Sequence, residues 1–120
     1  MFNEMTDSII DYTSALERIG GDKEFLDELL GIYQEEFDLS VDSLDQALLV
    51  QDFTAIQELG HSLKGSSANL SLIQLRDQAY LIETAGTELD LALAQRSTAE
   101  LKKEFQRLKE HLAEKERAGA

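Results

Sequence analysis

Apolar residues recur three and four positions apart through four separate segments of this chain. That spacing gathers them on one face of an α-helix, which turns by about 100° per residue. In the longest segment the period holds without interruption from Leu26 to Leu48, and no run alternates apolar and polar residues long enough for a buried strand. Proline is absent, and the strong helix formers Ala, Leu, Glu, Gln and Lys dominate. The sequence therefore predicts an all-α fold.

Capping residues divide the chain into one short helix and four long ones. An aspartate that can accept hydrogen bonds from first-turn N–H groups precedes four of them: Asp11, Asp22, Asp52 and Asp90. Glycines at 20–21 end the short helix, and Gly86 is expected to cap the fourth helix in the chain at its C-terminus. We expect a turn around Ser71 and allow for a bend near 38–40. The predicted helices cover about residues 12–19, 23–50, 53–70, 72–86 and 91–117.

Four long amphipathic helices with short links predict an antiparallel four-helix bundle, with the extra short N-terminal helix laid across one end. Residues 1–120 should form a single domain, because the length is that of one domain and no linker rich in Gly, Ser or Pro interrupts the pattern.

Charge and composition argue against several classes of function. Asp and Glu number 24 against 11 Lys and Arg, and the resulting charge of −13 disfavours binding to nucleic acids or anionic membranes. Without cysteine there is neither a disulfide framework nor Cys-ligated zinc. Neither a signal peptide nor an apolar run of bilayer length is visible, so we expect a soluble, cytoplasmic protein.

The segment from His61 to Leu70 holds the candidate functional site. On a helical projection His61 lies roughly 150° from the centre of the apolar stripe, and Gly65 is nearly opposite that stripe. Lys64 lies beside both on the helix surface. An exposed imidazole flanked by a cation and bare backbone suits contact with an anion, or with a protein that carries one. Taken alone, the spacing favours an ordinary surface histidine, because a His with a Lys three residues on is common by chance on helices.

Enzyme and metal-binding motifs find little support. The sequence has no P-loop and no nucleophile elbow. A Glu-x-x-His pair occurs once, as Glu58 and His61, whereas a di-iron bundle requires it twice together with two further inward carboxylates. His111 has charged neighbours and is expected to be a plain surface residue.

The run HSLKGSS at residues 61–67 carries a family resemblance. Further matching residues follow at fixed distances: Leu75, Ala79, Ile82 and Glu83. Together they closely resemble the histidine-containing phosphotransfer (HPt) family of two-component phosphorelays, and the resemblance extends over roughly residues 11–86. This sequence departs from the family pattern at Ser71, where glycine is usual, and at Ile82, where leucine is usual.

The resemblance implies a role for each matching residue. His61 would accept a phosphoryl group from a receiver-domain aspartate, or from a histidine kinase system, and pass it to another receiver. Neutral imidazole is a good nucleophile near pH 7. Lys64 would offset phosphate charge, and Gly65 would leave room for the receiver. Glu83 would reach the imidazole from the next helix and fix its tautomer.

The same resemblance implies a phosphoryl carrier with no ATP site, no metal and no cofactor of its own; Mg²⁺ would come with the receiver. The expected partners are receiver domains of response regulators or hybrid histidine kinases, engaged by a monomer. Two alternatives remain open: a phosphate-independent helical module that docks a signalling partner through the same face, and a metal or cofactor bundle.

Overall fold

The computed structural model describes residues 9–119, and over this part of the chain it contains five helices and no strand. Their bounds are Tyr12–Arg18 for α2, Lys23–Val50 for α3, Phe53–Asn69 for α4, Ile73–Glu88 for α5 and Leu91–Gly119 for α6. The predicted all-α class is confirmed.

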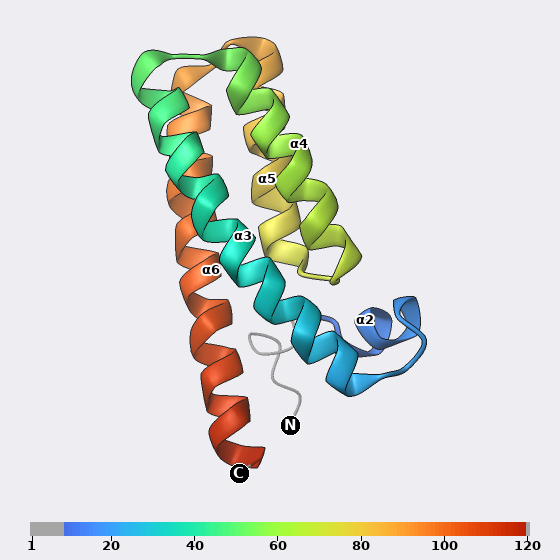
Figure 1. Ribbon diagram of the computed structural model, residues 1–120. Coiled ribbons are helices and arrows are strands. Elements are labelled where there is room, and N and C mark those ends of the chain that lie inside the picture. Colours follow the sequence, from blue (N-terminus) through green and yellow to red (C-terminus); the bar gives the residue numbers. More distant parts are fainter. Residues whose placement is uncertain (1–8, 120) are drawn as a thin grey trace, which may run out of the picture.

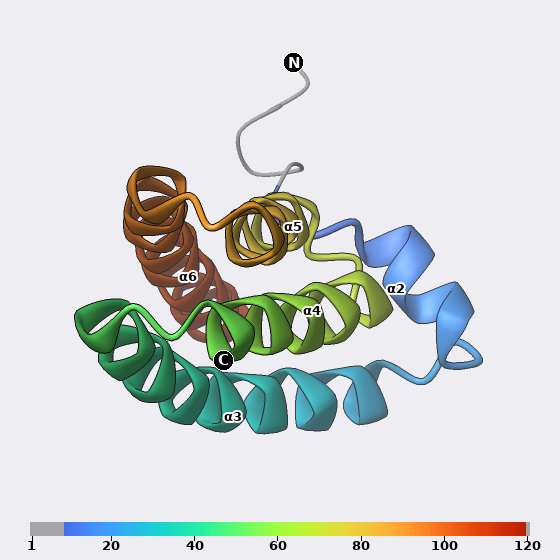
Figure 2. The same ribbon diagram turned by 90° about the horizontal axis from the view of Figure 1, so that it is seen from above.

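The four long helices alternate in direction and form an antiparallel bundle (Figure 1). Seen from above, α4 lies between α3 and α5, and α5 packs in turn against α6 (Figure 2). The short α2 lies at the end of the bundle where α4 turns into α5, and the Asp11 N–H donates there to the Ser71 carbonyl at 3.0 Å. The bundle and the helix across its end are as predicted.

Aspartate side chains cap the N-termini of four of the described helices, as the sequence indicated. Each accepts a hydrogen bond from a backbone N–H three residues ahead: Asp11 from Ser14, Asp22 from Phe25, Asp52 from Ala55 and Asp90 from Leu93. These bonds satisfy donors that have no partner within the helix. Consequently α2, α3, α4 and α6 start at the predicted residues.

The predicted end of α5 is wrong. Gly86 does not cap the helix but lies buried inside it, against α4, where an added Cβ would come within 2.5 Å of the Gln57 backbone nitrogen. The helix continues to Glu88 and ends at Leu89, whose φ of 58° is left-handed.

α3 runs on as one helix through residues 38–40. The remaining differences are of one or two residues: α2 ends at Arg18, α4 at Asn69, α5 begins at Ile73 and α6 extends to Gly119.

An aromatic cluster holds α3 against α6 at the centre of the bundle. The Phe37 and Phe105 rings stack with centroids 3.7 Å apart, and Tyr33 packs against both. Burying a side chain of this kind contributes about 1.5–3 kcal/mol. No helix within residues 9–119 is both long enough and apolar enough to cross a membrane.

Candidate functional site

Helix α4 presents its polar face to solvent because its apolar face is fixed against the bundle. The buried side of the helix is formed by Ile56, Gly60, Leu63 and Ser67. These positions are three and four apart, so they face one direction and leave the opposite side exposed. His61 lies on that exposed side, with 70% of its side chain accessible. The orientation predicted from the helical projection is therefore present.

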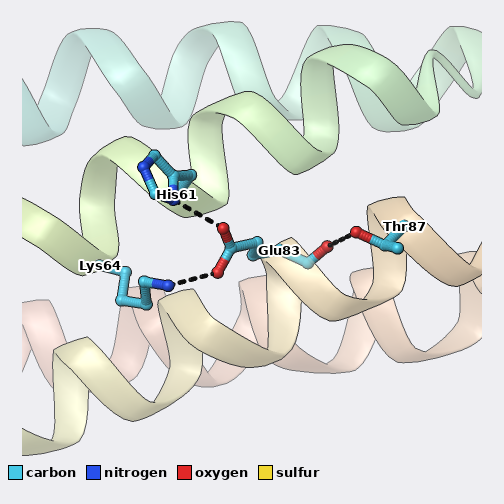
Figure 3. Close-up of polar contacts among 4 residues, drawn as sticks. All are labelled: His61, Lys64, Glu83 and Thr87. Atoms are coloured by element: carbon cyan, nitrogen blue, oxygen red, sulfur yellow. Dashed lines mark hydrogen bonds and ion pairs between the residues drawn. The ribbon is translucent and has the colours of Figure 1, made fainter.

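The structure brings Glu83 of α5 to the His61 imidazole (Figure 3). The His61 Nδ1 atom lies 2.7 Å from the Glu83 Oε2 atom. An ionised carboxylate can only accept, so Nδ1 carries the proton and donates it. In the neutral ring the Nε2 atom is then left with its lone pair free.

The second oxygen of the same carboxylate binds Lys64. The Lys64 Nζ atom donates to Glu83 Oε1 at 2.7 Å, and the carboxylate side chain is only 19% exposed (Figure 3). This hydrogen bond is the main cause that lowers the pKa of Glu83 below its ordinary value; burial opposes it, and the bond from His61 adds to it. Glu83 is therefore ionised at neutral pH and holds one donor on each oxygen.

Two glycines of α4 lie in opposite environments. At Gly65 an added Cβ would meet no heavy atom within 4 Å among the described residues outside its own turn of helix. At Gly60 an added Cβ would lie 2.5 Å from the Glu83 backbone nitrogen. Gly65 thus leaves open surface next to His61, as predicted, whereas Gly60 lets α4 and α5 approach closely enough for Glu83 to reach the ring.

A buried hydrogen bond sets the contact of α4 with α3. The Tyr33 and Ser67 hydroxyls lie 2.8 Å apart, and Ser67 is fully buried. Burial raises the pKa of Tyr33 far above its ordinary value, against the smaller lowering effect of the Ser67 bond. Ser67 therefore packs and bonds within the bundle, on the side of α4 away from His61.

A shallow cleft of about 510 Å³ borders the exposed face of α4. Its walls come from α2, α3 and α4 and include Ile19, Leu29, Ile32, Ser66 and Asn69. Ile32 is half exposed there, although it is a large apolar side chain. The cleft is thus a partly apolar surface, to which α4 contributes residues that follow Gly65 in the sequence.

His111 is not the plain surface residue that was expected. Its Nε2 atom lies 3.3 Å from the Tyr12 hydroxyl, and the side chain is half-buried between α2 and α6. Burial, followed by the nearby Lys115 charge, lowers the pKa of His111, and Glu114 opposes the shift. Its partner lies 99 positions away in the sequence, so no local pattern could indicate the contact.

Tyr80 is a neighbour of the site that the sequence analysis did not consider. The Lys64 Nζ atom lies over the Tyr80 ring, 5.7 Å from its centroid. The signal was its spacing, since Tyr80 precedes Glu83 by three residues on a helix and so shares its face.

No cluster of three or more His, Cys, Asp or Glu that could hold a metal occurs within residues 9–119.

Comparison with known proteins agrees with this geometry. The family model of the Hpt domain matches residues 28–111, which include His61, Lys64, Gly65 and Glu83. The search of curated proteins returned no match. The matched region covers most of the chain and all of α4 and α5. The chain therefore belongs to the Hpt family, the histidine phosphotransfer domains of two-component phosphorelays.

Proposed function

We propose that this protein is a phosphoryl carrier whose acceptor atom is Nε2 of His61. The observation that carries the proposal is the 2.7 Å contact between Nδ1 and the ionised Glu83, on a ring that is otherwise exposed. Because the Glu83 carboxylate accepts the proton of Nδ1 in a hydrogen bond, the Nε2 atom keeps its lone pair and can act as the nucleophile toward solvent. The donor would be a phospho-aspartate on a receiver domain, or a histidine kinase system, and the final acceptor another receiver.

In the transfer step, the bonds formed and broken involve only the His61 ring and the aspartyl phosphate. The Nε2 lone pair attacks phosphorus, the bond between phosphorus and the aspartyl oxygen breaks, and the carboxylate leaves with the bonding electrons. The Nδ1 proton stays on the ring, which now carries a positive charge. Glu83 stabilises that charge through the hydrogen bond already present. The reverse step, onto a second receiver, regenerates the neutral ring.

Charge neutralisation is the remaining requirement, because phosphoryl transfer depends on positioning and electrostatics more than on covalent groups. Lys64 supplies one cation next to His61 and at rest is paired with Glu83. We assign no cofactor, ATP site or metal to this chain; the Mg²⁺ would be bound by the receiver.

The partner surface would comprise the open patch at Gly65 and the cleft between α2, α3 and α4. A half-exposed Ile32 next to a polar α4 face suits a partner with an apolar contact surface around its own reacting aspartate. We propose receiver domains of response regulators or hybrid histidine kinases as partners, bound by a monomer in the cytoplasm.

A direct test is to incubate the protein with a panel of phosphorylated receivers from the same cell. Wild-type protein should gain an acid-labile phosphoryl group, and His61→Gln should gain none while its circular dichroism is unchanged. His111→Gln is the matched control and should be labelled like wild type. Labelling of His61→Gln would refute the assignment. Binding of receivers without any transfer would favour the phosphate-independent docking module instead.

A further inference from the structure

Tyr80 combines exposure with a contact to the site. It lies on α5 three residues before Glu83, and 55% of its surface is accessible although it is a large aromatic side chain. The face of its ring is directed to the Lys64 ammonium at 5.7 Å. That distance is within the range at which an aromatic ring attracts a cation.

Lys64 is thereby restrained from two sides. Its Nζ atom donates to Glu83 and lies over the ring of Tyr80. A lysine on a helix surface otherwise moves freely, because its stem has four rotatable bonds. The two contacts keep the ammonium at the junction of α4 and α5, where the Glu83 carboxylate lies between it and the imidazole.

The position of this charge matters because Glu83 is an anion. A phosphoryl group on Nε2 would add further negative charge close to the same carboxylate. An ammonium held at Glu83 Oε1 offsets the carboxylate before the phosphoryl group arrives. If Lys64 swung into solvent, the approaching phosphoryl group would face Glu83 without that compensation.

We propose that Tyr80 is a positioning residue for phosphoryl transfer at His61, acting through Lys64. This role does not require Tyr80 to contact the imidazole itself. The inference rests on the proposed function and deepens it: the ring confines the cation, the cation neutralises Glu83, and Glu83 orients His61.

An exposed aromatic side chain near the site could instead be a docking contact for the receiver. A phosphodonor without a protein surface separates these roles. We therefore choose phosphoramidate, from which Nε2 takes the phosphoryl group as the phosphorus–nitrogen bond breaks and ammonia leaves with the electron pair. A docking residue has no effect on this reaction, whereas a positioning residue does.

The experiment measures the rate of phosphorylation of five proteins by phosphoramidate, with circular dichroism to confirm folding. They are the wild type, Tyr80→Phe, Tyr80→Leu, Lys64→Met and the double variant of Tyr80→Leu with Lys64→Met. Tyr80→Phe keeps the ring and should match wild type. Tyr80→Leu should be slower by about two- to fivefold, the factor expected from an exposed cation–π contact. In the Lys64→Met background the same change should have no effect, because the group through which the ring acts is absent.

Two results would overturn the inference while leaving the proposed function in place. One is a Tyr80→Leu protein as fast as wild type, and the other is an equal loss with and without Lys64. A wild-type protein that takes no phosphoryl group from phosphoramidate or from any phosphorylated receiver would instead refute the proposed function, and the inference with it.

Discussion

At the residue scale, the Glu83 carboxylate couples two properties of the site. One oxygen fixes the proton on Nδ1 of His61, and the other holds the Lys64 cation. A carboxamide at this position can still accept a hydrogen bond but carries no charge, whereas a methyl group does neither. Conservative and radical substitutions of Glu83 therefore separate the effect of ring orientation from the effect of charge.

The Glu83→Gln protein should retain the Nδ1-protonated ring of His61, because the amide oxygen still accepts, and lose transfer rate by less than about tenfold. Glu83→Ala should give a mixture of both ring tautomers and a transfer slower by about 10²-fold, the order of a lost positioning contact. Nitrogen-15 NMR of the imidazole reports the tautomer, and the receiver assay reports the rate. Identical imidazole spectra in the wild type and both variants would show that the contact between Glu83 and His61 does not set the tautomer.

Sequence reasoning could assemble this site but not its surroundings. Helical spacing places His61 and Lys64 on the exposed face of α4, and the family resemblance supplies Glu83 from the next helix. Its spacing places Tyr80 on the same face of α5 as Glu83, but the contact of Tyr80 with Lys64 depends on how α4 and α5 meet in space. The contact of His111 with Tyr12 likewise depends on how two helices meet. Spacing within one helix carries no information about the side chains of another.

At the scale of elements, the two glycines of α4 allow a matched test of helix contact. Gly60→Ala should destabilise the protein by about 1–3 kcal/mol, because the new Cβ would overlap the α5 backbone at Glu83. Gly65→Ala should stabilise it by up to about 1 kcal/mol, since alanine is the better helix former and open space surrounds the site. Urea denaturation gives both values. Equal effects at the two positions would contradict the close approach of α4 and α5.

The buried Tyr33–Ser67 hydrogen bond between α3 and α4 leads to a second test of the same kind. Tyr33→Phe leaves the Ser67 hydroxyl buried without its partner and should cost about 1–3 kcal/mol in the free energy of unfolding. Adding Ser67→Ala removes the orphaned group, so the double variant should recover part of that loss. Purely additive losses in urea denaturation would show that the bond does not couple the two helices.

Helix starts were predictable and some helix ends were not. An aspartate cap acts within three residues, so its signal is local, and four helices begin where that signal lies. Gly86 has the same local appearance as a capping glycine, yet its actual role is to admit Gln57 of α4. Ser71 adopts a left-handed φ of 55°, which explains why glycine is usual at this turn in the family.

At the scale of the whole molecule, α2 joins two distant parts of the bundle. Its Ser14 hydroxyl accepts from Ser71 in the turn after α4, while Tyr12 contacts His111 on α6. The Lys115 ammonium lies 3.5 Å from the centroid of the Tyr12 ring and covers the same junction. Burial raises the pKa of Tyr12, and the charge of Asp27 on α3 raises it further, so side chains from three helices meet there.

This junction should make the stability of the protein depend on pH through His111. Burial and Lys115 lower the pKa of folded His111, whereas the unfolded residue keeps a value of about 6.5. Between the lowered value and 6.5 the unfolded chain binds more protons, so the free energy of unfolding falls as the pH decreases through this window. His111→Gln retains a polar side chain but does not titrate, and it should lose less stability over the same range.

The measurement is urea denaturation of both proteins about one unit above and one unit below the unperturbed value of about 6.5. All other titrating groups are common to the two proteins, so the difference between their pH dependences isolates His111. Lys115→Met removes the cation that contributes to the shift, and its pH dependence should lie between those of wild type and His111→Gln. If wild type and His111→Gln lose the same stability on acidification, the imidazole is not held neutral between α2 and α6.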